Sequence, residues 1–337
     1  MRARAGIALG LLLCAGSSGF AWADDSSATP SQWLARMSRA LTDSNYDGVF
    51  MHVRGGSVET LRIIHRVQDG TVDERLVSLD GSGREFIRRG NEMACYMPDS
   101  RTVVVEEQPA DARPLLGNLP RFDDTTANVY DIRAVGRARL LGRDTQLISV
   151  RPKDRFRYGY RLWIDESSNL PLRTQLCDAS GAVIEQIVFA NLTLPERIAD
   201  EQFRPQVAAA DFNWLRRGSR QVQAATSAAS WGGVKLPPGF RVAARTSQVM
   251  PGSEKQVDQV VFTDGLASIS VFVEQQGAPA RAGESEERET AVGSVSVFST
   301  VSGGQRYTAV GEAPIETVRY IATSVKSGAP DFGRRKR

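Results

Sequence analysis

Residues 29–54 read TPSQWLARMSRALTDSNYDGVFMHVR, and this segment is the most informative about the fold because it joins an amphipathic helix directly to a half-buried strand. Its first four residues place a threonine at the N-cap, a proline at the first helical position and a glutamine at the third, which is typical of a helix start. Apolar residues then follow at the spacing of one helix face: Trp33, Leu34, Met37 and Leu41. A helix this apolar needs a large surface to lie against.

The residues after the helix are expected to supply that surface as a β-sheet. Within residues 46–54, Phe50 and His52 alternate with apolar residues that belong to the opposite face of a strand. Further strands are expected over residues 60–66, 71–79, 84–89, 92–97, 102–106, 129–140, 145–151, 158–164, 172–177 and 183–194. Asp69-Gly70 and Asp80-Gly81 are expected to be two-residue hairpin turns. The prediction is one helix against a highly curved, mainly antiparallel sheet of about ten strands.

A change of composition marks the end of this first domain, which is predicted to span residues 24–203. Alanine, glutamine and serine dominate residues 204–230, which are interpreted as an interdomain linker that docks through Trp214. A smaller α+β domain is predicted over residues 231–327. Its strands are expected at residues 259–263, 267–274, 293–301 and 305–311, and its helix after Pro314. Residues 284–289 are expected to be a solvated acidic loop, and residues 328–337 a flexible tail.

The first 23 residues have the pattern of a cleaved secretory signal. Two early arginines precede an apolar stretch too short to span a bilayer, and Ala21-Trp22-Ala23 forms a cleavage site. The alternatives are a retained anchor and a lipoprotein signal at Cys14, although Leu13 stands where a small residue should precede that cysteine. The exported chain would carry 40 basic and 39 acidic residues. This balance gives no electrostatic argument for nucleic acid as a partner.

No motif for catalysis, metal binding or a cofactor can be recognised. The chain has two histidines, His52 and His65, and it lacks zinc spacing, a nucleophile elbow, a Walker loop and a dinucleotide fingerprint. A histidine on a strand is more often structural than catalytic. We therefore expect a binding protein and no enzyme, while a triad defined by geometry alone stays an alternative. Cys95 and Cys177, which remain after signal cleavage, form a disulfide or stay apart as buried thiols.

Several motifs occur in an order that covers nearly the whole mature chain. They are YDGVF at 46–50, GRDTQLISVRPKD at 142–154, RYGYRLWID at 157–165, LPLR at 170–173, LPPGF at 236–240 and DGLASISVFVE at 264–274. In this order they resemble the MucB/RseB family, periplasmic negative regulators of the envelope-stress sigma factor of the sigma-E/AlgU type. The two cysteines and the basic end at 334–337 have no counterpart in the family pattern.

The resemblance implies a fold and a function. The large domain would be an unclosed β-barrel around a helix, like a lipoprotein carrier, with an apolar cavity. The small domain and the linker would help to bind the periplasmic domain of a membrane-anchored anti-sigma factor and shield it from regulated proteolysis. Lipopolysaccharide or another acylated lipid would release the regulator. No cofactor, metal or nucleic acid is implied, and homo-oligomerisation stays open.

Candidate site residues follow from this expectation. The cavity candidates are Trp33, Met37, Leu41, Phe50 and Trp163, with ordinary core packing as the alternative. The partner-binding candidates are the large aromatic residues Trp214 and Trp231, with interdomain packing as the alternative. Arg155 and Arg157 would meet lipid phosphates or lie in a solvated loop.

Two other functions stay in view. A periplasmic lipid or lipoprotein carrier would share the open barrel, but it would not need the second domain. A secreted hydrolase would depend on His52 or His65, and the sequence gives it little support.

Overall fold

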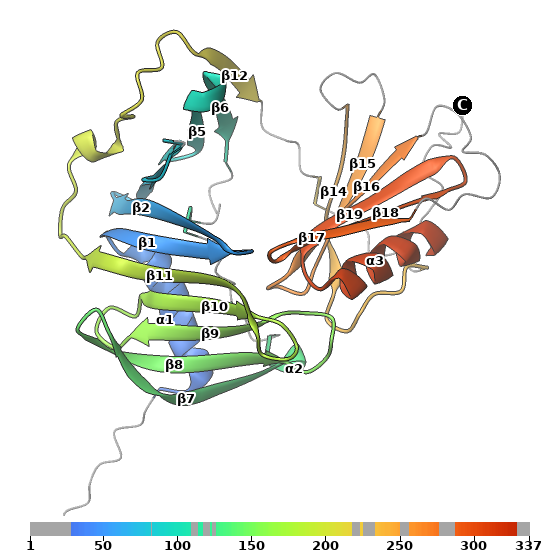
Figure 1. The fold of residues 1–337 in the computed structure, drawn as a ribbon, viewed down its shortest axis with the longest axis horizontal. Coiled ribbons are helices and arrows are strands. Elements are labelled where there is room, and N and C mark those ends of the chain that lie inside the picture. Colours follow the sequence, from blue (N-terminus) through green and yellow to red (C-terminus); the bar gives the residue numbers. More distant parts are fainter. Residues whose placement is uncertain are drawn as a thin grey trace, which may run out of the picture.

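The computed structural model describes residues 28–81, 83–108, 114–116, 122, 126–217, 223–224, 233–249, 256–275 and 287–328. These residues form two β-sheets, each with its own core (Figure 1). The predicted signal at 1–23, Trp231 and the basic end lie outside the described residues. No helix in the described part of the chain is long and apolar enough to cross a membrane.

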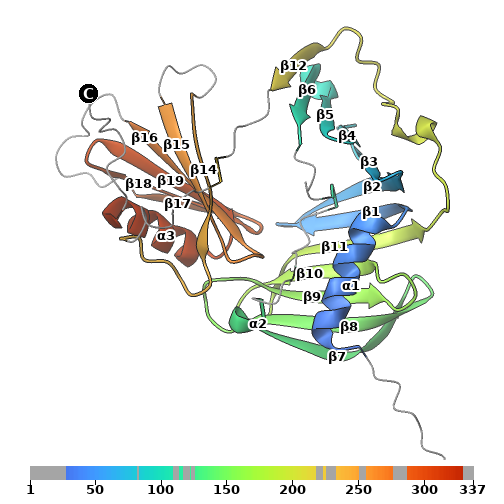
Figure 2. The same ribbon diagram turned by 180° about the vertical axis from the view of Figure 1, so that it is seen from behind.

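The first helix, α1 (Pro30–Asp43), begins as its sequence predicts. The Thr29 hydroxyl accepts a hydrogen bond from the Gln32 amide at 3.2 Å, and the Gln32 side chain accepts one from the Thr29 amide at 2.8 Å. This reciprocal capping box satisfies two amides that have no partner within the helix. The buried face of α1 lies across one face of the large sheet (Figure 2).

The large sheet is not closed. Its order is β12-β6-β5-β4-β3-β2-β1-β11-β10-β9-β8-β7, so β12 and β7 are its two edges. All neighbouring pairs are antiparallel except β12 with β6. The strands are β1 (Tyr46–Arg54), β2 (Ser57–Gln68), β3 (Thr71–Ser78), β4 (Glu85–Arg89), β5 (Glu92–Met97), β6 (Thr102–Glu107), β7 (Tyr130–Leu140), β8 (Arg143–Pro152), β9 (Gly159–Asp165), β10 (Pro171–Cys177), β11 (Val183–Thr193) and β12 (Asn213–Arg217). The mainly β class and the open sheet are thus confirmed. The short helices η1 (Pro98–Ser100), α2 (Thr126–Val129) and η2 (Asp200–Phe203) lie between strands.

The two predicted hairpin turns have different outcomes. Asp69 and Gly70 both have positive φ, 52° and 75°, and join β2 to β3 directly, as a tight hairpin turn requires. The prediction for Asp80-Gly81 is wrong, because β3 ends at Ser78 and β4 begins at Glu85. The Asp80 carboxylate instead accepts a hydrogen bond from the Thr60 amide of β2 at 2.5 Å. The connection from β3 to β4 is therefore longer than a two-residue turn.

Residues 204–217, which the composition assigned to a linker, are bound to the large sheet. β12 pairs with β6 in parallel, with Trp214 opposite Val103. Ala209 and Phe212 join a separate apolar cluster with β4, β5 and β6. The Gln206 amide also donates to the buried Glu85 carboxylate at 3.0 Å. The end of the first domain therefore wraps over its own sheet before the chain reaches the second domain.

The second sheet has the order β13-β14-β15-β16-β19-β18-β17, and all its neighbours are antiparallel. Its strands are β13 (Gln223–Ala224), β14 (Arg241–Val249), β15 (Gln256–Thr263), β16 (Ser268–Gln275), β17 (Arg288–Val292), β18 (Val295–Ser302) and β19 (Gln305–Glu312). The predicted C-terminal helix is α3 (Ile315–Gly328), which packs on β18 and β19. The acidic-loop prediction is wrong for residues 288 and 289, which belong to β17. Every residue of β17 is exposed, so the strand has no buried face to mark it in the sequence.

Of the two alternatives for the cysteines, the structure has the separate thiols. Cys95 and Cys177 are free thiols on β5 and β10. In the sheet, β4, β3, β2, β1 and β11 stand between them, and neighbouring strands lie about 4.8 Å apart. A disulfide needs Cβ atoms within about 4.5 Å of each other. Burial raises the pKa of both thiols, which also makes them less reactive.

Candidate functional site

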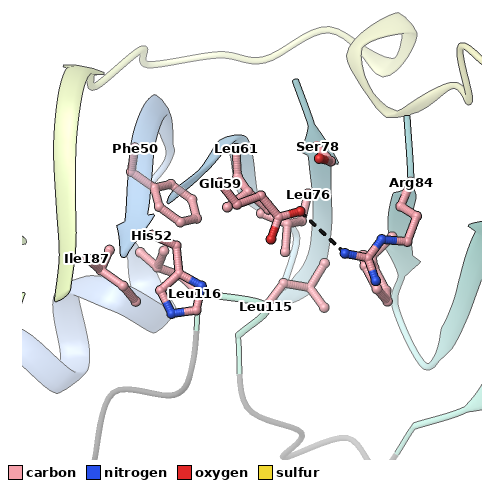
Figure 3. A pocket seen from close by; sticks show the side chains of 11 residues that line it. Phe50, His52, Glu59, Leu61, Leu76, Ser78, Arg84, Leu115, Leu116 and Ile187 are labelled. Atoms are coloured by element: carbon pink, nitrogen blue, oxygen red, sulfur yellow. Dashed lines mark hydrogen bonds and ion pairs between the residues drawn. The ribbon is translucent and has the colours of Figure 1, made fainter. Parts of the chain in front are cut away.

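A cavity of about 210 Å³ opens on the face of the large sheet that carries α1. Its lining comes from β1, β2, β3, β4, β11 and the turn at residues 115–116 (Figure 3). The apolar lining residues are Phe50, Leu61, Leu76, Phe86, Leu115, Leu116 and Ile187, and the polar ones are His52, Glu59, Ser78 and Arg84. Apolar walls with a few polar groups are typical of a binding site for an amphiphilic small molecule.

The polar groups give the cavity a charged edge. Arg84 pairs with Glu59 across the cavity, with 3.3 Å between Nη2 and Oε1 (Figure 3). Both side chains are partly exposed, so water screens this ion pair and it contributes little to stability. The Arg84 guanidinium is therefore available to an anionic group at low cost.

A buried carboxylate fixes one wall of the cavity. Glu74 on β3 accepts a hydrogen bond from the Leu115 amide at 2.9 Å and faces Arg88 at 3.4 Å. Burial raises the pKa of Glu74 to about 7, because the bonds from Leu115 and Arg88 offset only part of the cost of desolvation. His65 lies 3.9 Å away, and burial lowers its pKa to about 4. His65 donates through Nδ1 to the Ser44 carbonyl and stacks on Tyr46, so it has a structural role.

The predicted cavity residues are not all brought together. Phe50 lines the cavity. Met37 and Leu41 are buried in the core beneath α1, and Trp33 packs partly buried against that core. Trp163 alternates on β9 with the core residues Leu162 and Ile164, so its side chain points to the opposite face of the sheet. There it stacks with Arg173 at 5.3 Å.

A buried ion pair joins the two domains. Arg157 is fully buried and donates to Asp264 of the small domain at 2.9 Å and to the Pro238 carbonyl at 2.5 Å. The guanidinium also lies over the rings of Tyr130 and Phe240. Asp264 in turn accepts from the amides of Leu266 and Ala267. Arg157 Nε also donates to Asp154 at 3.1 Å, so every charged atom of the pair has a partner, as a buried pair requires.

The neighbours of Arg157 extend this contact. The Thr317 hydroxyl of α3 donates to the Phe156 carbonyl at 2.8 Å, and the rings of Phe156 and Tyr320 pack 5.6 Å apart. Arg155 pairs with Glu316 at 3.3 Å on the surface. Both interpretations of Arg157 from the sequence, a lipid phosphate contact and a solvated loop, are therefore wrong, because the residue is enclosed by the second domain.

A second contact between the domains lies beside the cavity. His52 Nε2 is 2.5 Å from Glu185 Oε1, and the Ser294 hydroxyl of the small domain donates to Glu185 Oε2 at 2.7 Å. Ser294 is fully buried and Glu185 nearly so. Burial alone would raise the pKa of Glu185, but the hydrogen bonds from His52 and Ser294 bring it below its ordinary value. The carboxylate therefore stays charged between two donors, one from each domain.

The two partner-binding candidates differ in what the structure describes. Trp214 lies on the edge strand β12, packs edge-on against Tyr96 and donates to the Ala209 carbonyl at 3.2 Å. It is still 47% exposed, and its neighbour Leu215 is 43% exposed. Such an aromatic and apolar edge is accessible to a partner. Trp231 lies outside the described residues.

Sequence reasoning missed the residues that join the domains. Arg157 and Asp264 are 107 positions apart in the sequence. No local spacing relates them, and many other charged residues would look equally suitable. Glu185 and Ser294 carry no motif at all. Within the described residues, no group of three or more histidine, cysteine or acidic side chains has the arrangement of a metal site.

The comparisons with known proteins cover both domains. The family model of the MucB/RseB N-terminal domain matches residues 29–207, and that of the MucB/RseB C-terminal domain matches residues 225–326. The sigma factor AlgU regulatory protein MucB of Pseudomonas aeruginosa is 33% identical over 90% of this chain and 92% of its own length. The sigma-E factor regulatory protein RseB of Escherichia coli K12 is 29% identical over 90% and 93%. The Pseudomonas aeruginosa MucA/MucB complex structure is similar with a TM-score of 0.67 and 29% identity, covering 87% of this chain and 96% of that one.

Proposed function

Because the chain belongs to the MucB/RseB family, we propose that it is a periplasmic negative regulator of an envelope-stress sigma factor. In this proposal it binds the periplasmic domain of a membrane-anchored anti-sigma factor and shields it from regulated proteolysis. An acylated lipid such as lipopolysaccharide then releases it. Cleavage of the signal at residues 1–23 would deliver the chain to the periplasm.

One observation carries the proposal. The likeness to the relatives extends through both domains, and a relative of the same architecture is known in complex with MucA. A carrier of lipids alone would not require the second domain. The buried contacts of Arg157 and Glu185 join that domain to the first. Two domains held together in this way offer a large surface, which suits the binding of a protein partner better than the transport of a lipid.

The cavity supports the lipid part of the proposal. Its volume of about 210 Å³ is below the roughly 300–1,000 Å³ of sites that enclose a whole drug-sized ligand. It would therefore take part of one acyl chain between Phe50, Leu61 and Ile187, with an anionic headgroup near Arg84. A larger lipid would require the Leu115–Leu116 turn or α1 to move, and only then would Met37 and Leu41 meet the ligand.

The exposed edge at β12 supports the protein partner. Trp214 and Leu215 present apolar surface next to a strand edge, and aromatic residues in such positions often carry much of a binding energy. We propose that Trp214 and Trp231 both contact the partner. The proposal involves no catalytic step, cofactor or metal.

A protection assay tests the proposal. The periplasmic domain of the host's anti-sigma factor is incubated with its regulated protease, with and without purified residues 24–337. We expect cleavage to slow with the protein present and to recover when lipopolysaccharide is added. Unchanged cleavage, together with transfer of lipoproteins between membranes by the purified protein, would favour the carrier instead.

A further inference from the structure

The cavity and the domain interface share one residue. His52 lines the cavity, and the same imidazole binds the Glu185 carboxylate that accepts the hydrogen bond from Ser294. His52 and Ile187 are opposite each other on β1 and β11, and Glu185 lies two residues before Ile187 on the same face. A ligand that moves His52 therefore acts on the contact between the domains.

A second carboxylate, that of Glu59, lies close enough to His52 to accept its hydrogen bond. Glu59 of β2 lies opposite His52 in the strand register and lines the same cavity. It is held by Arg84 at 3.3 Å. Side chains directly opposite each other on antiparallel strands lie within contact distance. An anionic headgroup that binds Arg84 would free Glu59 to accept from His52 in place of Glu185.

The small domain approaches this point closely. Ser294 lies in the turn between β17 and β18, and Gly293 in that turn has φ of +59°. A Cβ at Gly293 would overlap the side chain of Arg54 on β1. The turn therefore contacts β1 directly. A displacement of the Glu185 carboxylate would act on the turn through its hydrogen bond with Ser294.

We propose that His52, Glu185 and Ser294 form a relay through which an anionic acyl ligand in the cavity loosens the small domain from the large one. The relay depends on the lipid binding proposed above and names how that site is regulated. The ligand headgroup binds Arg84, and Glu59 then accepts the hydrogen bond of His52. The buried Glu185 carboxylate keeps Ser294 as its single donor. A buried carboxylate with one donor is costly, so water enters and the turn at Ser294 separates from β1. Coupling of this kind is reciprocal, so a loosened turn also favours the ligand.

The test uses residues 24–337 with decyl phosphate as the anionic probe and decanol as the uncharged one, both below the concentration at which they aggregate. Binding is measured by calorimetry, and the turn at residues 293–295 is followed by hydrogen exchange. Ser294→Ala removes the interdomain hydrogen bond. Ser299→Ala is the matched control, because Ser299 lies on β18 and bonds Thr308 within the small domain.

The relay predicts that decyl phosphate speeds exchange at the turn about tenfold in the wild type and in Ser299→Ala. In Ser294→Ala the turn exchanges fast without ligand, and decyl phosphate binds roughly fivefold more tightly. Decanol leaves the turn unchanged. If decyl phosphate binds the wild type and Ser294→Ala equally and exchange at the turn does not change, the relay is wrong. The proposed lipid site would still be supported. Equal opening of the turn by decanol would overturn the step through Arg84. If neither probe binds, the proposed lipid site fails and the relay with it.

Discussion

At the scale of a residue, the buried pair of Arg157 and Asp264 decides how the two domains meet. Both side chains are fully buried, and the pair also positions the Tyr130 hydroxyl, which donates to Asp264 at 3.4 Å. Burial and the nearby carboxylate raise the pKa of Tyr130 well above its ordinary range, so the phenol stays a donor. Removing Arg157 leaves the Asp264 carboxylate without its cation in a dry site.

Arg157→Met is expected to lower the free energy of unfolding of the coupled domains by about 3–5 kcal/mol. Adding Asp264→Asn should recover part of the loss, because the uncompensated charge is gone while Oδ1 still accepts from the 266 and 267 amides. Chemical denaturation of the single and double variants measures both effects. Arg155→Met, which breaks only an exposed pair, should stay within about 0.5 kcal/mol of the wild type. Losses that add independently in the double variant would contradict the pairing.

Glu74 gives the stability a dependence on pH with a definite sign. Its pKa is about 7 in the folded protein against an ordinary value of 4.5, so the folded state binds this proton more tightly than the unfolded state does. The stability from this proton is fully present below pH 4.5 and is lost as the pH rises through 7.

Glu74→Gln should therefore gain stability relative to the wild type between pH 5 and pH 8, on the order of 2 kcal/mol. Glutamine keeps an acceptor for the Leu115 amide and cannot ionise. Urea denaturation at the two pH values gives the difference. The lowered pKa of His65 acts in the opposite direction, but it is common to both proteins. Parallel stability curves for the two proteins would show that the carboxylate is already charged when buried.

At the scale of an element, α1 and most strands could be predicted, because each has a local signal. The capping box starts α1, and Asp69-Gly70 closes a hairpin whose strands alternate. β12 could not be predicted. Its five residues pair in parallel with β6, more than a hundred positions earlier, and no turn or periodicity records such a pairing. β17 was missed for a different reason, since all its side chains are exposed.

The position of α1 makes Met37 a test of packing. Met37 is fully buried between the helix and the sheet, so Met37→Ala should cost about 2–5 kcal/mol through lost contacts and a cavity. Met51→Ala is the control, because Met51 on β1 is 37% exposed and should change stability by less than about 1 kcal/mol. Thermal or urea denaturation measures both. Equal effects of the two substitutions would mean that α1 is not packed as described. Met37→Glu would place a charge in this core, so it is expected to unfold the domain before it reports on lipid binding.

At the scale of the whole molecule, the sequence predicts two domains and a cavity on one of them, but not how they are joined. Phe50 lies on the cavity side of β1, but alternation along a strand only separates its two faces and does not tell which of them meets the helix. Size and apolarity likewise do not reveal the face on which Trp163 lies. Arg157, Glu185 and Ser294 acquire their roles only when strands from two domains meet.

We propose that one molecule of this protein binds both an anti-sigma factor and a lipid, and that the lipid weakens the protein complex. The decisive experiment is calorimetric titration of residues 24–337 with the periplasmic domain of the host's anti-sigma factor, repeated with lipopolysaccharide fragments. We expect tight binding without lipid and at least a tenfold loss of affinity with lipid, which corresponds to a coupling of about 1.4 kcal/mol. An absence of binding to the anti-sigma factor in both conditions, with lipid still bound, would contradict it.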